Sequence, residues 1–177
     1  MTITDILAKY GSDKVTGHRY GPVYEKIFGG FDRDAQLDLM EIGVQNGGSI
    51  MAWAEYFPHA NIHGMDIVDV RKPEWKSARA RFILGDVNLT PVEGRFDIVI
   101  DDGSHQLPDV LNAVRKFLPL LKPGGVIIVE DVQQPKPWLF QIAKLAGIFR
   151  IMTGKIRYYD MRAGGGGIDD FIVTIRK

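Results

Sequence analysis

Residues 37–66 read LDLMEIGVQNGGSIMAWAEYFPHANIHGMD, and this stretch decides the fold. An apolar run from Leu37 to Ile42, typical of a buried parallel strand, leads directly into a glycine-rich turn. Ser49 to Phe57 has the composition of a helix, which Pro58 ends. A second strand is expected from Ile62 to Ile67. This order predicts a strand, turn, helix and strand unit of a parallel sheet.

The glycine turn and the acid after the second strand have the features of a ligand site. Gly43 and Gly47 let a ligand approach the backbone closely, and the helix that begins at Ser49 offers free N–H groups at its N-terminus. Asp66 can accept hydrogen bonds from both hydroxyls of a ribose. The spacing G-x-x-x-G-G and the acid Glu41 both differ from the pattern of dinucleotide enzymes. The alternative is a strand-to-helix turn that binds no ligand.

The composition is that of one ordinary globular domain. The chain has 177 residues, of which 45% are hydrophobic and 25% charged. Lysine plus arginine equals aspartate plus glutamate, so we do not expect a large nucleic-acid-binding surface, which needs a basic excess. The absence of cysteine excludes disulfides and is compatible with a cytoplasmic protein. No signal peptide or apolar run of membrane-spanning length is visible, so we expect no membrane partner.

Helices and strands alternate along the rest of the chain. Helices are expected at Thr2–Tyr10, Val23–Phe28, Pro73–Arg79, Leu107–Leu121 and Trp138–Phe149. Strands are expected at Phe82–Leu84, Phe96–Ile100, Val126–Val129, Ile156–Met161 and Asp170–Arg176. Such alternation predicts an α/β fold with a parallel sheet and helices on both faces. The final two strands follow each other directly, so one of them must run antiparallel.

Acidic residues end four consecutive predicted strands. They are Asp66, Asp86, Asp101 with Asp102, and Glu130 with Asp131. The carboxyl ends of parallel strands open onto one crevice, so these carboxylates should converge and repel one another unless a cation lies among them. The cation could be the positive groups of a cofactor or a divalent metal, and three carboxylates suit Mg²⁺. The alternatives are solvated acids in a surface turn and, for Asp131, a helix cap.

The stretch DDGSH, residues 101–105, is the most specific of these acidic sites. Asp101 and Asp102 should point in different directions if the strand continues to them, one toward cofactor and sheet and the other into the cleft. His105 follows Asp102 by three residues and could reach a bound hydroxyl. Histidine is the usual base near neutral pH. The alternative is a loop histidine bonded to the backbone.

EIGVQNGGS and GMDI resemble motif I and the following acid of class I S-adenosylmethionine (SAM) dependent methyltransferases. Together with GSDKVTGHRYGPVYE, DDGSH and LKPGGVIIVED, they resemble one group in particular. This group is the metal-dependent sugar O-methyltransferases of macrolide antibiotic biosynthesis, of the mycinamicin 2''-O-methyltransferase type. The resemblance runs from Gly11 to about Asp131.

The resemblance implies a doubly wound, mostly parallel seven-stranded Rossmann-like sheet with an antiparallel closing strand. It implies one methyltransferase domain over residues 1–177, in which residues 1–34 form a helical cap and a loop on the cofactor side. The implied cofactors are SAM and Mg²⁺. Implied SAM-binding residues are Glu41, Gly43, Gly47, Ser49, Asp66, Asp86, Asp101, Lys14 and Tyr20, and implied metal ligands are Asp102, Glu130 and Asp131.

The function implied is methyl transfer from SAM to a hydroxyl of a small molecule, a sugar or polyol, with His105 as the base and Asp102 as its catalytic neighbour. Two alternatives stay open. A non-catalytic SAM-binding partner subunit would bind cofactor without needing metal. A cephalosporin-hydroxylase-like enzyme would need iron, which two histidines and a carboxylate usually hold. The sequence does not decide between a monomer and a homo-oligomer.

Overall fold

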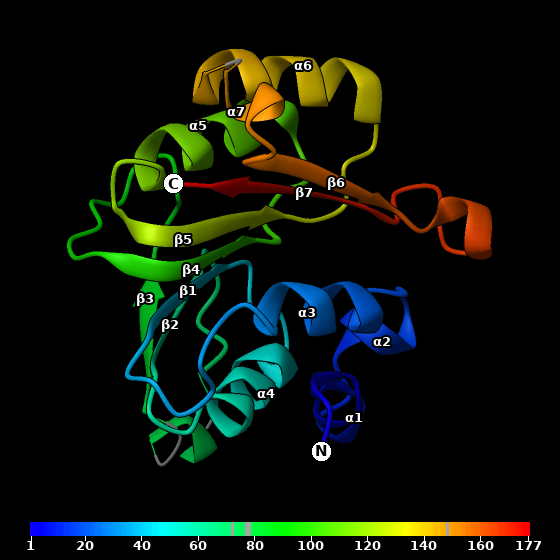
Figure 1. The fold of residues 1–177 in the computed structure, drawn as a ribbon. Coiled ribbons are helices and arrows are strands. Elements are labelled where there is room, and N and C mark those ends of the chain that lie inside the picture. The colour runs from blue at the N-terminus through cyan, green and yellow to red at the C-terminus, as the bar shows by residue number, and fades with distance from the viewer. Residues whose placement is uncertain (72, 77–78, 148) are drawn as a thin grey trace.

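The computed structural model describes residues 1–71, 73–76, 79–147 and 149–177. These residues contain a seven-stranded sheet with the order β3-β2-β1-β4-β5-β7-β6 (Figure 1). The strands are β1 (Asp38–Ile42), β2 (Asn61–Asp66), β3 (Ala80–Leu84), β4 (Phe96–Asp101), β5 (Leu121–Val129), β6 (Ile156–Asp160) and β7 (Phe171–Arg176). Strands β1 to β5 pair in parallel, and β7 runs antiparallel to β5 and β6. The predicted fold class, with its antiparallel closing strand, is confirmed.

Helices cover both faces of this sheet (Figure 1). On one side lie α1 (Ile3–Lys9), α2 (Asp13–Thr16), α3 (Gly21–Phe28) and α4 (Gly48–Tyr56), and on the other α5 (Leu107–Phe117), α6 (Pro135–Ala146) and α7 (Phe149–Met152). Two short 3₁₀ helices, η1 (Pro73–Lys76) and η2 (Arg162–Gly164), complete the described elements. No helix of the described residues is both long and apolar enough to cross a membrane.

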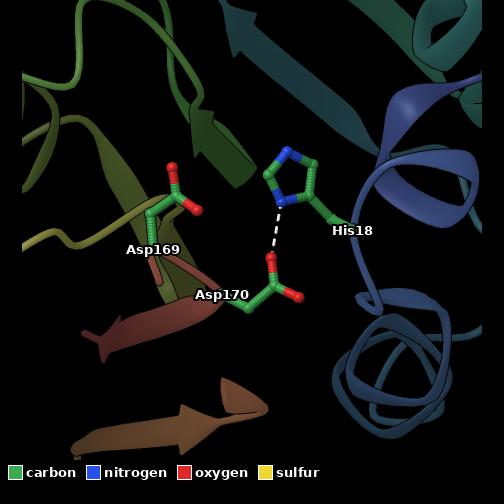
Figure 2. Close-up of side chains that lie close together, drawn as sticks. All are labelled: His18, Asp169 and Asp170. Carbon is green, nitrogen blue, oxygen red and sulfur yellow. Dashed lines mark hydrogen bonds and ion pairs between the residues drawn. The ribbon is translucent and has the colours of Figure 1, made fainter. Parts of the chain in front are cut away.

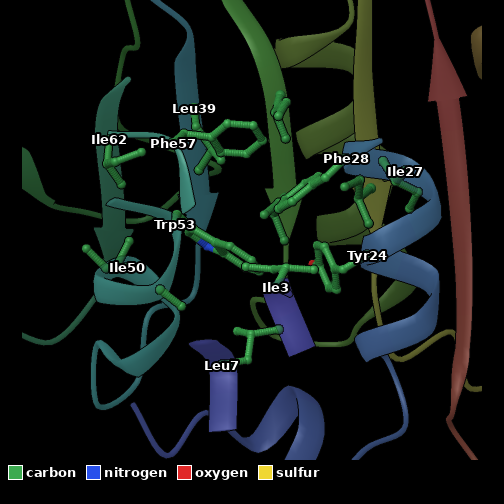
Figure 3. Packing of buried hydrophobic residues seen from close by; sticks show 14 of the residues in the cluster. Ile3, Leu7, Tyr24, Ile27, Phe28, Leu39, Ile50, Trp53, Phe57 and Ile62 are labelled. Atoms are coloured by element: carbon green, nitrogen blue, oxygen red, sulfur yellow. The ribbon is translucent and has the colours of Figure 1, made fainter. Parts of the chain in front are cut away.

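Each face of the sheet has its own hydrophobic core, because the central strands are buried on both sides. Under α1, α3 and α4, the rings of Tyr24, Phe28, Trp53 and Phe57 pack against one another with centroids about 5 Å apart (Figure 3). This aromatic cluster anchors the N-terminal helices to the sheet. They therefore hold the loop between α1 and α3 at the carboxyl ends of the strands.

Several element boundaries differ from the sequence prediction. Residues 122–125, expected as a turn, lie inside β5, where the pairing with β4 shifts register. Helix α5 ends at Phe117, shortly before Pro119, and α6 begins at Pro135, because proline suits the first turn of a helix. The predicted helix at residues 73–79 is a 3₁₀ turn over Pro73–Lys76, and residues 77 and 78 lie outside the described part.

Gly43, at the end of β1, is required by the packing of two strand ends. Its φ of 78° lies in the left-handed region, and an added Cβ would lie 2.0 Å from the carbonyl oxygen of Asp102. The contact arises because β1 and β4 are parallel neighbours, with Ile42 paired to Asp101. This glycine therefore sets how closely the two loops at the carboxyl end of the sheet approach each other.

We predict that Gly43→Ala lowers the free energy of unfolding by more than about 3 kcal/mol, from the left-handed backbone plus the steric clash. Gly124→Ala is the matched control, because Gly124 has a φ of 81° but nothing within 4 Å of an added Cβ. It should lose only about 1–2 kcal/mol. Urea unfolding of both variants checks this, and equal losses would contradict the role of the Asp102 contact.

Candidate active site

The carboxyl ends of β1 to β5 border an open cleft of about 810 Å³. Several residues predicted from the sequence line it, namely Gly43, Asp66, Asp86, Asp101, Asp102, His105 and Asp131. Asp13, the first residue of α2, and His18, which follows α2, also line the cleft. The expected convergence of acidic strand ends on one crevice is thus confirmed for these residues.

Asp66 braces the glycine turn. Its Oδ2 accepts hydrogen bonds from the backbone N–H groups of Val44 at 2.9 Å and Gln45 at 3.2 Å, and its Oδ1 accepts from Val68 at 3.0 Å. Asp86 similarly accepts a hydrogen bond from the N–H of Asn88 at 2.7 Å. Both carboxylates are half-buried on the cleft wall, so each combines a turn-stabilising bond with access to a ligand.

Lys14 is a buried cation at the centre of the acidic cluster. Its side chain is 1% exposed, and its Nζ lies 2.5 Å from Asp102 Oδ2, 2.8 Å from Glu130 Oε2 and 3.3 Å from Glu41 Oε1. Burial alone would lower the pKa of Lys14, but the carboxylates of Asp102, Glu130 and Glu41 outweigh it and raise that pKa well above the ordinary lysine value. Lys14 is therefore a charged bridge between three strand ends.

Glu41 and its neighbours lie behind the cleft wall. Glu41 is fully buried, and its Oε2 accepts hydrogen bonds from Ser49 Oγ at 2.8 Å and Trp53 Nε1 at 2.9 Å. Gly47 has a φ of 73° and packs so closely that an added Cβ would lie 2.4 Å from the ring of Trp75. These contacts give Glu41, Gly47 and Ser49 structural roles. Their contact with SAM stays a prediction.

Two tyrosines from the N-terminal segment hold the acids that follow β5. The hydroxyl of Tyr24 donates to Glu130 Oε1, and that of Tyr20 donates to Asp131 Oδ1. Both tyrosines are fully buried, so Tyr20 acts here on a carboxylate of the cluster. Because Glu130 has one oxygen on Lys14 and the other on Tyr24, it is turned away from the cleft.

Among the described residues two groups have metal-binding geometry, His18 with Asp169 and Asp170, and Asp102 with His105 and Asp131. In each group the ligand atoms all lie within 4.8 Å of one another, and the second contains residues predicted from the sequence. His105 Nε2 is 3.9 Å from Asp102 Oδ1 and 3.6 Å from Asp131 Oδ2. The structure therefore brings together two of the three predicted metal ligands and places the predicted base beside them. Glu130, the third predicted ligand, is held by Lys14 and Tyr24 instead.

The backbone is strained where this group sits. His105 has a φ of 53° and Asp131 a φ of 52°, and Gln45, in the glycine turn, has a φ of 42°. All three line the cleft, and a left-handed non-glycine residue costs about 1–3 kcal/mol. Strain of this kind typically marks positions where side-chain direction matters more than stability.

Asp101 is more deeply buried than Asp102, although both line the cleft. It is 6% exposed, burial and the neighbouring Asp102 charge raise its pKa to about 7, and its Oδ2 has no hydrogen-bond partner among the described residues. Asp102 instead spans the space between Lys14 and His105. Burial also raises the pKa of Asp131, against the bond from Tyr20. The cleft therefore carries more acid than the single buried ammonium of Lys14 balances.

The sequence of residues 40–132 matches a family described as methyltransferase domain. The match contains β1, the glycine turn, Asp66, and the acids that follow β4 and β5, which are the elements that build the cleft. The chain belongs to this methyltransferase domain family.

The relatives of this methyltransferase domain agree with the resemblance seen in the sequence. The 8-demethyl-8-alpha-L-rhamnosyl tetracenomycin-C 2'-O-methyltransferase of Streptomyces olivaceus is 35% identical over 145 residues, which are 74% of this chain and 38% of that protein. The mycinamicin VI 2''-O-methyltransferase of Micromonospora griseorubida is 36% identical over 129 residues, which are 65% of this chain and 32% of that protein. The chain thus spans about a third of the length of these curated relatives.

A solved structure supports the fold. The MycE methyltransferase from the mycinamycin biosynthetic pathway, in complex with Mg, SAH and mycinamycin VI, matches with a TM-score of 0.75. The match covers 99% of this chain and 54% of MycE at 24% sequence identity. At that identity the likeness establishes the Rossmann-like methyltransferase fold.

Sequence reasoning missed two contributors to this methyltransferase site, Tyr24 and Asp170. Tyr24 lies within the quoted stretch GPVYE, but helical periodicity alone assigns it to the core. Asp170, fully buried just before β7, lies 2.6 Å from the ring of His18 (Figure 2). No local pattern connects these two residues, which are 152 positions apart.

We predict that Lys14→Met lowers the free energy of unfolding by about 3–5 kcal/mol, because it leaves buried carboxylates without their cation. Lys9→Met is the matched control, since Lys9 pairs with Glu55 at the surface, 49% exposed, and should leave the unfolding midpoint nearly unchanged. Urea unfolding at neutral pH compares them. Equal midpoints for the two variants would show that Lys14 does not hold the cluster together.

Proposed function

We propose that this chain transfers a methyl group from SAM to a hydroxyl of a sugar-like small molecule, with the help of Mg²⁺. The observation that carries the proposal is the group of Asp102, His105 and Asp131 on the wall of a cleft that also contains the glycine turn and Asp66. A carboxylate pair beside an imidazole suits the deprotonation of a hydroxyl. Membership of the methyltransferase domain family supports SAM as the methyl donor.

The cofactor side of the cleft is chemically suited to SAM. Asp66 and Asp86 present carboxylates on the wall formed by the ends of β2 and β3, where they could accept hydrogen bonds from a ribose and from the amino group of an adenine. The volume of about 810 Å³ lies within the usual range for small-molecule sites. The acidic excess favours the positive sulfonium and amino groups of SAM. We assign ribose binding to Asp66.

The metal side fits Mg²⁺ through oxygen ligands from Asp102 and Asp131. Bound there, Mg²⁺ would lower the pKa of an acceptor hydroxyl. Glu130 would join these ligands only by giving up a bond to Lys14 or Tyr24. We therefore assign to Glu130 a supporting role, in which it shares the Lys14 ammonium with Asp102.

His105 is the proposed base. Its Nε2 lies within 4 Å of both proposed ligand carboxylates, so it faces the same space as a hydroxyl held there. It takes the proton from that hydroxyl, and the oxygen then attacks the methyl carbon of SAM in line, releasing S-adenosylhomocysteine. The left-handed backbone of His105 keeps its ring in this direction.

The acceptor class follows the relatives. The two relatives from Streptomyces olivaceus are named for 2'-O- and 3'-O-methylation of rhamnosyl tetracenomycins. We therefore propose a deoxyhexose or similar polyol as the acceptor for this chain, with methyl α-L-rhamnopyranoside as a soluble probe.

The purified chain should form S-adenosylhomocysteine from SAM when supplied with Mg²⁺ and this rhamnoside. EDTA should abolish the reaction, and excess Mg²⁺ should restore it, because the metal acidifies the hydroxyl. Mass spectrometry of the sugar product provides the measurement. Full turnover in EDTA would remove the metal from the proposal, whereas tight SAM binding without any turnover would favour a non-catalytic partner subunit.

Calorimetric titration with Mn²⁺ separates the proposed ligands from Glu130. Asp131→Asn should weaken Mn²⁺ binding, while Glu130→Gln should leave it nearly unchanged if Glu130 only supports Asp102. Equal weakening by both substitutions would return Glu130 to the ligand set that the sequence resemblance implied.

On the cofactor side, Asp66→Ala should weaken SAM binding by roughly tenfold to a hundredfold, the value of one charge-assisted hydrogen bond. Because Asp66 also braces the turn through Val44 and Gln45, Asp86→Ala serves as a comparison that leaves those bonds in place. Calorimetry with SAM provides the measurement, and an unchanged affinity would exclude Asp66 from the site.

A further inference from the structure

His18 and Asp170 form an imidazole–carboxylate pair at the cleft, next to Asp131 at the end of β5. His18 Nδ1 lies 2.6 Å from Asp170 Oδ1, and the other ring nitrogen, Nε2, is turned away from Asp170 (Figure 2). Asp170 is 0% exposed, whereas the His18 side chain is 23% exposed and lines the cleft. One member of the pair is therefore sealed in the protein, and the other faces the ligand space.

The surroundings of His18 hold its ring in one orientation. The ring stacks on Tyr20 with centroids 4.9 Å apart and planes 17° apart. A buried carboxylate beside Nδ1 favours a proton on that nitrogen. Burial alone would lower the pKa of His18, but the carboxylates of Asp170, Asp131 and Asp169 outweigh it and raise that pKa. Burying a carboxylate is costly, and Asp170 Oδ2 has no hydrogen-bond partner among the described residues. The Asp170 carboxylate contacts the His18 ring, so we attribute to this buried charge the role of orienting His18.

His18 and His105 each lie near one oxygen of the same carboxylate, that of Asp131. His18 Nδ1 is 3.7 Å from Asp131 Oδ1, and His105 Nε2 is 3.6 Å from Asp131 Oδ2. The proposed metal ligand therefore lies between two imidazoles that come from distant parts of the chain. The proposed reaction uses His105 as the base and assigns no role to His18.

We infer that His18, oriented by Asp170, positions the acceptor through a hydrogen bond between its Nε2 and a second hydroxyl, next to the one that is methylated. This inference rests on the proposed function and narrows its acceptor to molecules with at least two neighbouring hydroxyls. His18 contacts the acceptor, and Asp170 acts through His18 as a positioning residue.

Two substitutions of His18 separate contact with the acceptor from a structural role. In His18→Asn the amide group can replace Nδ1 toward Asp170 but not Nε2, whereas the longer side chain of His18→Gln can place an amide near Nε2. With methyl α-L-rhamnopyranoside, His18→Asn should lower kcat/KM for the acceptor by about tenfold to a hundredfold, with the KM for SAM unchanged. His18→Gln should recover part of the loss. A normal kcat/KM in His18→Asn would overturn the inference.

Nitrogen-15 NMR of the imidazoles tests the pair without any acceptor, and the chain has only four histidines to assign. His18 should carry its proton on Nδ1 in the wild-type chain, and Asp170→Asn should abolish this preference. A wild-type His18 protonated only on Nε2 would overturn the inference, even if methylation is observed. If no acceptor is methylated at all, the proposed function fails, and with it the acceptor contact, while the NMR result still decides whether Asp170 orients His18.

Discussion

The site depends on one buried ammonium group. Lys14 brings its charge to within 3.3 Å of carboxylates from β1 and from the loops after β4 and β5. Without a cation these acids would repel one another at the carboxyl edge of the sheet, where the parallel fold forces them together. The same contacts attach the N-terminal segment to the strand ends, so the cation both closes the fold over the sheet and defines one wall of the cleft.

The contacts of Lys14 and the two tyrosines divide the acids into two groups with different roles. Glu41 and Glu130 lie behind the wall, where both are ion-paired with Lys14 and accept hydrogen bonds from neutral donors of α4 and α3. Asp102 is held through one oxygen by Lys14 and Asp131 through one oxygen by Tyr20, and the other oxygen of each lies within 4 Å of His105 on the cleft wall. Because a carboxylate held by such contacts has little freedom to rotate, Asp102 and Asp131 keep a fixed orientation at the cleft. A ligand then meets an arrangement that is already formed.

Periodicity and the parallel-sheet rule predicted the strands, the glycine turn, and the meeting of Asp66, Asp86, Asp101, Asp102 and Asp131 at one cleft. They could not predict which acids face the cleft, because that depends on pairs such as Lys14 with Glu130, which are 116 residues apart. The pairing of His18 with Asp170 escaped for the same reason. Gly43 was read as a position for ligand approach, but its close neighbour is the backbone of Asp102. Local sequence patterns therefore predict where strands end, but they do not predict which side chains from distant loops contact one another.

The charges that remain explain why a cationic cofactor and a metal could share one cleft. Lys14 supplies one positive charge to a cluster that includes Glu41, Asp102 and Glu130, and Asp101 and Asp131 lie just beyond it. Burial and the Asp102 charge raise the pKa of Asp101 to about 7, so part of the surplus is relieved by a proton near neutral pH. Cations bound on the open side would relieve more of it. A sulfonium near Asp101 and a divalent ion between Asp102 and Asp131 would each reduce the repulsion among these carboxylates. The two ligands should therefore compensate the same acidic surplus from different ends of the cleft.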